Sequence, residues 1–519
     1  MNNNPSSPAP ALGVAWFFLY GYLGVPASNY LPALRDLGGN FTKVYLFWQQ
    51  LEPEKDRYDW TALDAFVNQL DTPEEGLVSL FSSSLWATER SAGMLPPSPA
   101  KDLREYYQLV FQMVKRAAGR VRYWQNDSEP NNPVYWASTA EKFVEQLRVF
   151  YRAVKDADPQ AIVVVGGYDG LFVPPNLTPL PGQRVAPFPQ QEAGLKFFHH
   201  VIREAHDSFD VFDLRLYGDA YTITARVEYF KQVLHAVGKD APIICTEYGG
   251  PNFFEFPENR QYVPLINSWM QSIENDAFAS AASPQGHATN RISALYAEMP
   301  TLAAPTQMFM QGCSAELEER YHRIQSRSLV MRNLFAFAAG VQRTLYWDLL
   351  HANGPRDDVM TLMYGKIGLL EPILNAASSD ASAAFKRCPS AEVFARLTAH
   401  FAGFTRVQRH PIADEPNRFV FSIERANRPM LFVFWERRDL FMGETLPPSD
   451  FAWPWPDRAA RATDLFGKMI SVNVSENTLR FPLTIDPLFV EAPSAPALAA
   501  PDSTSSSSIS AVTRSHELA

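Results

Sequence analysis

The amino-acid sequence predicts an α/β protein in which a (β/α)8 barrel is followed by a small antiparallel β-sandwich. Three observations lead to this prediction. Eight short apolar runs alternate with segments of helical periodicity over residues 11–402, which is the pattern of a closed parallel barrel. No G-x-G-x-x-G sequence follows the first run, which disfavours an open dinucleotide-binding sheet. Residues 403–492 contain short apolar runs without helices between them, which is typical of a sandwich.

Each barrel strand is assigned to a short apolar run that ends at turn-forming or polar residues. The eight runs are residues 12–19, 41–48, 77–85, 121–124, 161–166, 211–217, 242–246 and 343–349. Between them, apolar residues recur at intervals of three and four, which indicates amphipathic helices. These helices are expected at residues 31–37, 60–70, 102–118, 139–156, 191–205, 224–237 and 316–339, and a last helix at 391–401 is expected to close the barrel.

Segments with no helix or strand pattern interrupt the barrel and flank both domains. Residues 174–189 are too rich in proline for a helix or a central strand, and residues 252–311 form a long insertion after the seventh run. The first ten residues and residues 493–519 are rich in Asn, Ser, Ala and Pro, so we expect both to be disordered tails. The expected domains are therefore the barrel, 11–402, and the sandwich, 403–492.

Charge and composition exclude several classes of partner. The chain has 46 Lys and Arg against 56 Asp and Glu, a formal net charge of −10, and no long basic run, so no nucleic-acid partner is expected. Three scattered cysteines are too few for a disulfide framework or a zinc cluster, and the ten histidines include no H-E-x-x-H motif. We therefore expect neither a metal site nor a cofactor.

The start of the sequence predicts a cytoplasmic protein that makes no membrane contact. No positive charge precedes the apolar run at residues 11–25, although a secretory signal normally has one. The same run is too short to span a bilayer, and its Trp, Tyr and Gly residues fit a first barrel strand and its loop better.

Two glutamates follow predicted strands at the same edge of the barrel. Glu129 comes just after the fourth run and Glu247 just after the seventh, and a turn-forming segment follows each of them. Barrel enzymes place their chemistry at this edge, and retaining glycoside hydrolysis needs two carboxyl groups about 5 to 5.5 Å apart. Either glutamate alone also fits a solvated residue past a strand end. The matching pair predicts catalysis, with Glu129 as the acid/base and Glu247 as the nucleophile.

Several motifs resemble those of clan A glycoside hydrolases, which are retaining enzymes built on a TIM barrel. Residues 129–131, Glu-Pro-Asn, resemble the end of the clan's N-E-P-N motif, and residues 246–249 resemble its nucleophile motif. Residues 48–64 resemble the clan's second-strand signature. The region of residues 462–491 is similar to the sandwich of β-xylosidase-like and iduronidase-like members. The resemblance implies the same barrel and the same roles for the two glutamates.

The sequence also departs from this clan at two positions. Clan members have Asn directly before the acid/base, where its amide holds the sugar 2-hydroxyl; this chain has Ser128. A shorter hydroxyl cannot make the same two-point contact, so we expect Asn126 to take over this role or the contact to be lost. The sixth strand of clan members usually ends in His-x-Tyr, where this chain has Tyr217-Gly218-Asp219. Tyr217 is expected either to face the nucleophile or to pack in the core.

Aromatic residues at strand ends are candidates for sugar stacking. The chain has 11 Trp, 20 Tyr and 36 Phe, and the apolar faces of sugar rings stack on such side chains. Trp48, Trp86 and Trp347 lie at the ends of the second, third and eighth predicted strands. Each of them fits a stacking wall or a core position equally well. In the resemblance, Trp347 takes the place of a sugar-facing aromatic.

Taken together, the sequence predicts a retaining glycoside hydrolase that acts on a carbohydrate. The insertion at residues 252–311 leaves from the catalytic edge and favours a pocket over an open cleft. The alternative is a non-catalytic carbohydrate-binding barrel, in which Ser128 and Tyr217 mark the loss of the catalytic machinery. A transglycosylase would share the same site. No G-x-S-x-G elbow or P-loop is present, which argues against serine hydrolase and nucleotide chemistry.

Overall fold

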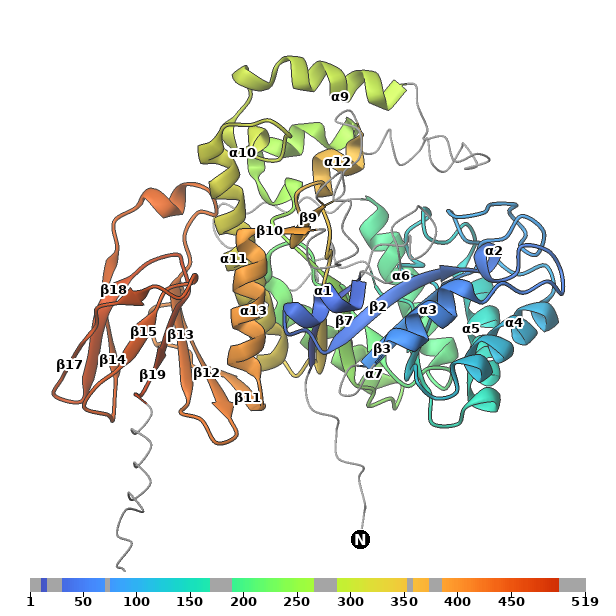
Figure 1. Ribbon diagram of the computed structural model, residues 1–519, viewed down its shortest axis with the longest axis horizontal. Helices are drawn as coiled ribbons and strands as arrows, with labels where there is room; N and C mark the ends of the chain where they lie inside the picture. The colour runs from blue at the N-terminus through green and yellow to red at the C-terminus, as the bar shows by residue number, and fades with distance from the viewer. Residues whose placement is uncertain are drawn as a thin grey trace, which may run out of the picture.

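The computed structural model describes residues 11–15, 30–70, 75–168, 189–265, 287–351, 358–372 and 385–493. These residues form a parallel barrel surrounded by helices, with antiparallel sheets beside it (Figure 1). This arrangement confirms the predicted barrel followed by a β-sandwich. The expected tails, the end of the first strand at residues 16–19 and almost all of the proline-rich segment lie outside the described residues.

The barrel strands are hydrogen-bonded in the order β5-β4-β3-β2-β1-β8-β7-β6. Their bounds are β1 (Ala11–Ala15), β2 (Phe41–Phe47), β3 (Glu75–Phe81), β4 (Tyr123–Asn126), β5 (Ile162–Val165), β6 (Phe212–Asp213), β7 (Ile243–Tyr248) and β8 (Arg343–Tyr346). Between β5 and β6 the ring is completed by a parallel bridge from Val164 to Val211 and by a bond from the amide of Val165 to the carbonyl of Val211, 3.2 Å. Closure brings the carboxyl ends of all eight strands to one rim.

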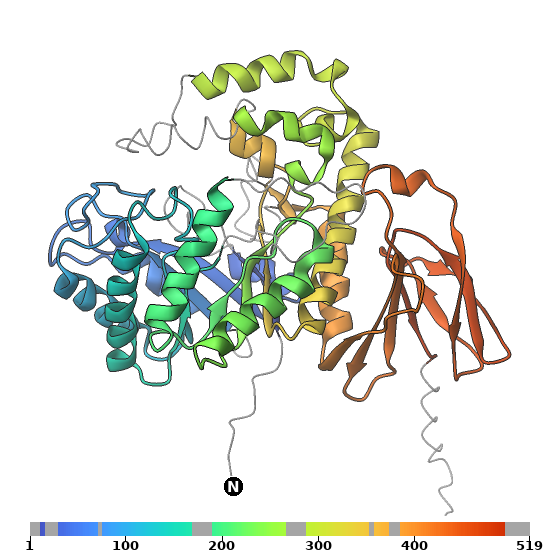
Figure 2. The ribbon, with the colours of Figure 1, turned by 180° about the vertical axis from the view of Figure 1, so that it is seen from behind.

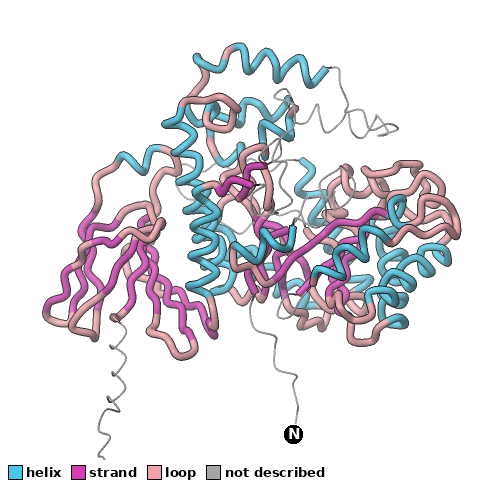
Figure 3. Tube along the Cα trace, in the orientation of Figure 1, coloured by secondary structure: helices cyan, strands magenta, loops and turns pink. Residues whose placement is uncertain are grey.

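Helices cover the outside of the barrel, as the cyan ring around the magenta strands shows (Figure 3). They are α1 (Tyr30–Asp36), α2 (Trp48–Leu51), α3 (Thr61–Gln69), α4 (Leu103–Ala117), α5 (Ala140–Ala157), α6 (Pro189–Ala205), α7 (Ile223–Ala236), α11 (Ala315–Ala338) and α13 (Pro389–Phe401). Three of them begin at side-chain caps, Asp102 for α4, Thr139 for α5 and Ser314 for α11, each accepting a backbone N–H of the first turn.

Two antiparallel sheets form the sandwich. The larger sheet has the order β11 (Phe404–Arg409), β12 (Arg418–Arg425), β13 (Leu431–Glu436), β19 (Leu488–Glu491), β15 (Arg461–Thr463) and β16 (Met469–Ile470). The smaller sheet has the order β14 (Ser449–Pro454), β18 (Thr478–Leu483) and β17 (Asn473–Ser475). Phe434 and Phe481 meet edge-to-face between them, 5.0 Å apart. The strands β11, β14 and β17 were not predicted from the sequence, because exposed polar residues interrupt their apolar runs.

The sandwich packs against the helices α11 and α13 of the barrel (Figure 2). Trp435 of β13 stacks on Phe419 and Phe421, at 5.4 and 5.2 Å. It also meets Phe335 of α11 edge-on at 5.9 Å, and its Nε1–H donates to the hydroxyl of Tyr221 in the 3-10 turn η2 (Ala220–Thr222), 3.1 Å. The two domains therefore share one continuous apolar core.

A second apolar core lies on the rim where the strands end. The insertion after β7 contains η3 (Phe253–Glu255), η4 (Pro257–Tyr262), α9 (His287–Ala297), η5 (Met299–Thr301) and α10 (Ala304–Gln307). Its apolar residues pack with those of α12 (Val359–Tyr364), the helix that follows β8, and the group is seen above the barrel (Figure 1). A short hairpin of β9 (Leu370–Pro372) and β10 (Phe385–Arg387) leads to α13. A last 3-10 turn, η7 (Met442–Thr445), precedes β14. In the described part of the chain, no helix is long and apolar enough to cross a membrane.

Candidate active site

Glu247 reaches the barrel interior because the β7 ladder is irregular at this point. The pairing of β7 with β8 shifts register between Cys245 and Tyr248. Such a shift breaks the strict alternation of side chains along a strand. As a result two consecutive residues, Thr246 and Glu247, both contact the same ammonium group, that of Lys43 on β2, at 2.9 and 3.2 Å. Both side chains are buried.

Four donors surround the Glu247 carboxylate. Its Oε1 atom accepts from Lys43 at 3.2 Å, from the hydroxyl of Tyr45, and from Nη1 of Arg215 at 2.6 Å. In the described part of the chain, the donor to its Oε2 atom is the hydroxyl of Tyr217, at 3.2 Å. Burial raises the pKa of Glu247, and the neighbouring ammonium of Lys43 opposes this shift. Burial and the nearby Arg215 in turn lower the pKa of Lys43 to about 8.

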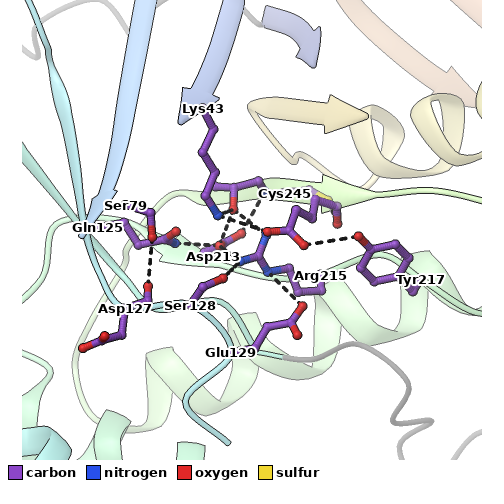
Figure 4. Close-up of polar contacts among 12 residues, drawn as sticks. Lys43, Ser79, Gln125, Asp127, Ser128, Glu129, Asp213, Arg215, Tyr217 and Cys245 are labelled. Atoms are coloured by element: carbon purple, nitrogen blue, oxygen red, sulfur yellow. Dashed lines mark hydrogen bonds and ion pairs between the residues drawn. The ribbon is translucent and has the colours of Figure 1, made fainter. Parts of the chain in front are cut away.

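Arg215 lies at the centre of the cluster and is fully buried. It follows β6 with Asp213 and Tyr217 on the same face, since side chains two apart in an extended segment point the same way. Its Nη1 donates to Thr246 at 2.7 Å, its Nη2 donates to Ser128, and it pairs with Asp213 at 3.6 Å. Its Nε lies 3.6 Å from Oε1 of Glu129. Figure 4 shows the guanidinium among Asp213, Ser128 and Glu129.

Glu129 projects from a turn that the sequence holds in an unusual backbone conformation. Asp127 and Glu129 have φ angles of 54° and 49°, in the left-handed region that non-glycine residues rarely adopt. The turn is anchored from outside the site, because the Asp127 carboxylate accepts from the amide and hydroxyl of Ser82, at 2.7 and 2.9 Å. The carbonyl of Glu129 also accepts from the amide of Asn132, 2.9 Å. Backbone strain of this kind is often found at functional sites.

The structure brings together four of the residues singled out in the sequence. Glu129, Glu247, Ser128 and Tyr217 all contact Arg215 or one another. Tyr217 faces the nucleophile candidate, which decides between the two placements expected for it.

Trp347 borders the same region through the turn that follows Glu247. A Cβ atom placed on Gly249 would lie 2.7 Å from the carbonyl oxygen of Trp347 and 3.5 Å from the ring of Tyr217. The indole of Trp347 in turn meets the ring of Tyr364 edge-on, at 5.2 Å.

Three other candidates lie elsewhere. Asn126 points out of the barrel and accepts from the hydroxyl of Tyr106 on α4, at 2.5 Å, because it is one position out of phase with the inward-facing Gln125. Trp48 is fully buried against Tyr106 and Trp86 in the layer between strands and helices. The indole of Trp86 donates to the carbonyl of Glu52, 2.9 Å. Asn126 therefore points away from the candidate site, and of the two placements expected for Trp48 the structure shows the core position, which corrects the choice of both as substrate-binding candidates.

The polar residues that surround the pair were not predicted from the sequence. Lys43 and Tyr45 lie on β2, and Asp213 ends β6 while Arg215 follows it; the members of each pair are two positions apart inside an otherwise apolar run. That spacing puts each pair on one face of its strand, and a charge inside an apolar strand was the available signal.

Across the ranges described above, no group of three or more His, Cys, Asp or Glu side chains is arranged to hold a metal ion.

Comparison with known proteins shows the fold of clan A glycoside hydrolases. No protein-family model and no curated protein sequence matches the chain. Among solved structures, a family 39 glycoside hydrolase from Bacteroides cellulosilyticus WH2 is similar at 13% identity and a TM-score of 0.59, over 93% of this chain and 81% of that one. A monomeric β-xylosidase from Caulobacter crescentus CB15 is similar at 14% identity and 0.54, over 93% and 97%. A family 51 α-L-arabinofuranosidase from Bifidobacterium longum gives 11% and 0.52, over 95% and 98%. The fold predicted from the motifs is thereby confirmed.

Proposed function

We propose that this protein is a retaining glycoside hydrolase that cleaves O-glycosidic bonds of an oligosaccharide, a polysaccharide or a glycoside. The observation that carries the proposal is that Glu129 and Glu247, from strand ends far apart in sequence, contact one buried guanidinium at the carboxyl-end rim of the barrel. Two carboxyl groups facing one site are the machinery of glycoside hydrolysis. The clan A fold supports the same assignment.

In the first step Glu247 attacks the anomeric carbon while Glu129 gives its proton to the departing glycosidic oxygen. The carbon–oxygen bond to the leaving group breaks as the bond to the Glu247 carboxylate forms. Oε2 is the attacking atom in this proposal, because three described donors engage Oε1 and one described donor, Tyr217, engages Oε2. The donors on Oε1 hold the carboxylate in one orientation, which lowers the entropic cost of the attack.

In the second step Glu129 removes a proton from water, and the water oxygen displaces Glu247 from the anomeric carbon. Arg215 links the two steps. While Glu247 carries the sugar it has no charge, so the guanidinium is left facing Glu129 and Asp213. A nearby cation favours the ionised carboxylate, which is the form of Glu129 that acts as a base.

A panel of aryl glycosides, with the anomer of the first product followed by NMR, tests the proposal. We expect hydrolysis of at least one glycoside with retention of configuration. Glu247→Ala should lose the activity, and azide should rescue it by direct attack, giving a glycosyl azide of inverted configuration. Glu129→Ala with azide should give the retained configuration, since azide then attacks the glycosyl-enzyme.

Glu54→Ala is the matched control, because Glu54 is an exposed glutamate paired only with the nearby Arg57. Unchanged hydrolysis by Glu247→Ala would contradict the assignment. Sugar binding without turnover of any glycoside would instead support a non-catalytic carbohydrate-binding barrel.

A further inference from the structure

A second group of reactive side chains lies beside the apolar core that the insertion after β7 forms with α12, away from the two glutamates. It consists of Cys313, which precedes α11, Glu318 in the first turns of α11, and Lys366, which follows α12. The Nζ atom of Lys366 lies 3.2 Å from the sulfur of Cys313, and it also donates to the carbonyl of Met308 at 3.0 Å. We call these three residues the Cys313 cluster.

Glu318 contacts both other members of the cluster. Its Oε2 atom accepts from the thiol of Cys313 at 3.3 Å and from the ammonium of Lys366. Burial acts to raise the pKa of Glu318, but hydrogen bonds from His322 and Lys366 outweigh it and lower the pKa to about 2. The carboxylate is therefore ionised at neutral pH and lies within hydrogen-bond distance of both the thiol and the ammonium.

The cluster differs from the surroundings of the other two cysteines of the chain. Cys245 is fully buried and its thiol donates to the backbone carbonyl of Glu247, 3.1 Å. Cys388 is buried and its sulfur lies 3.2 Å from a ring nitrogen of His351. Among the described residues, Cys313 is the cysteine with a lysine amine within hydrogen-bond distance, and it is only partly buried, so a small oxidant can reach it.

We propose that Cys313 and Lys366 form a covalent sulfur–nitrogen cross-link when the protein is exposed to hydrogen peroxide. The Cys313 sulfur attacks one peroxide oxygen, the O–O bond breaks, and sulfenic acid and one water form. The neutral amine of Lys366 then attacks the sulfur, the S–O bond breaks, and the hydroxyl leaves with one amine proton as a second water. Thiol, amine and one peroxide thus give a sulfenamide and two waters, and Glu318 relays the protons.

The link would join two chain segments that are 53 residues apart. It fastens the end of α12 to the start of α11 and leaves Glu129 and Glu247 untouched. Lys366 comes two residues after Tyr364, whose ring meets that of Trp347 at 5.2 Å beside the candidate active site. The cross-link therefore anchors a segment that borders this site, and it does not depend on the proposed hydrolase activity.

Mass spectrometry of the full-length protein after peroxide treatment and proteolysis tests this proposal. We expect a linked pair of peptides that contain Cys313 and Lys366, with two hydrogens fewer than their sum, and no cleavage by trypsin after Lys366. Excess dithiothreitol should release both peptides, since a thiol attacks the linked sulfur. A linked pair with one extra oxygen, from an N–O–S bond or a sulfinamide, also supports the site.

Lys366→Arg is the sharpest control, because arginine keeps a positive charge beside Glu318 but lacks the nucleophilic amine. It should fold as the wild type does by circular dichroism and give no linked pair, as should Cys313→Ser. Cys245 and Cys388 serve as internal controls, because their sulfurs contact a backbone carbonyl and a histidine ring nitrogen. Oxidation of Cys313 to sulfinic acid with no linked pair, or an unreacted Cys313 thiol, would overturn the proposal.

Discussion

Nη1 of Arg215 lies 2.6 Å from Oε1 of Glu247, and neither side chain has more than a small fraction of its surface exposed. A buried ion pair of this kind is costly to break, because the remaining charge stays in a medium of low polarity. Asp213 and Glu129 face the same guanidinium, at 3.6 Å each. The electrostatic organisation of the site therefore depends on one residue, and the first prediction concerns it.

Replacing Arg215 by Met should lower the free energy of unfolding by about 3 to 5 kcal/mol, because three buried carboxylates lose their shared cation. Urea unfolding measures this loss. Arg116→Met is the matched control, since Arg116 forms an exposed pair with Asp64 and such pairs contribute about 0 to 1 kcal/mol. Equal losses in the two variants would contradict the central role of Arg215.

Gly167→Ala should reduce hydrolysis without changing any charge. A Cβ atom at this position would lie 2.5 Å from Oδ2 of Asp213 and still closer to Nε of Arg215, so the guanidinium must move. A displacement of about 1 Å in a catalytic site can cost roughly 100-fold in rate. The measurement is kcat/KM on the most responsive aryl glycoside. Gly93→Ala serves as control, because its Cβ would meet only Gln49 at 3.9 Å; a G167A enzyme as active as G93A would rule out this steric coupling.

Tyr217→Phe should lower kcat by roughly tenfold to 100-fold. The hydroxyl of Tyr217 is the one described donor to Oε2 of Glu247, at 3.2 Å, and a hydrogen bond to a charged group contributes about 1.5 to 3 kcal/mol. Steady-state kinetics on the same glycoside give the comparison. Tyr221→Phe removes a hydroxyl that is bonded to Trp435 at the domain interface, so it should affect stability and leave kcat unchanged. A reduced kcat in both variants would point to a general loss of structure.

Lys43 should make the stability of the protein depend on pH in the alkaline range. Its pKa is lowered from 10.5 to about 8 by burial and by Arg215. Between these values the unfolded chain keeps a proton that the folded protein has lost, so the free energy of unfolding rises with pH. The rise amounts to up to about 3 kcal/mol, since one pKa unit corresponds to about 1.4 kcal/mol.

Lys43→Met removes the titrating group and should not show this rise. Comparing urea unfolding of the variant and the wild type at about pH 8 and about pH 10.5 isolates the contribution of Lys43, because the other groups titrate in both proteins. A wild-type minus variant difference that stays constant with pH would contradict the prediction.

Much of the fold follows from local patterns in the sequence. The helix α5 (Ala140–Ala157) is within one residue of its predicted bounds, because its apolar spacing and its cap at Thr139 are local signals. The strand β6 is much shorter than its predicted run, residues 211–217, since only Phe212 and Asp213 form a regular ladder. Beyond them the side chains of the segment face the site. Pairing with neighbouring strands sets where a strand ends, and sequence periodicity does not report this pairing.

The candidate site also combines features that local sequence patterns predict with features that depend on strand pairing. The positions of Glu129 and Glu247 after apolar runs could be predicted from the sequence, because a strand end followed by a turn is a local feature. The alternation that points Asn126 toward Tyr106 instead of the barrel interior depends on the register of β4, and the register is fixed only when neighbouring strands pair.

By itself, therefore, the sequence determined the order of the barrel strands and helices and the placement of the two glutamates after strand ends, since periodicity and turn residues act over a few positions. Tertiary structure alone decided that Lys43, Arg215 and Ser128, from three separate strand regions, meet around those glutamates. The physical reason is that closing the sheet brings distant residues to one rim, where a buried charge is tolerated only if partners from other strands reach it.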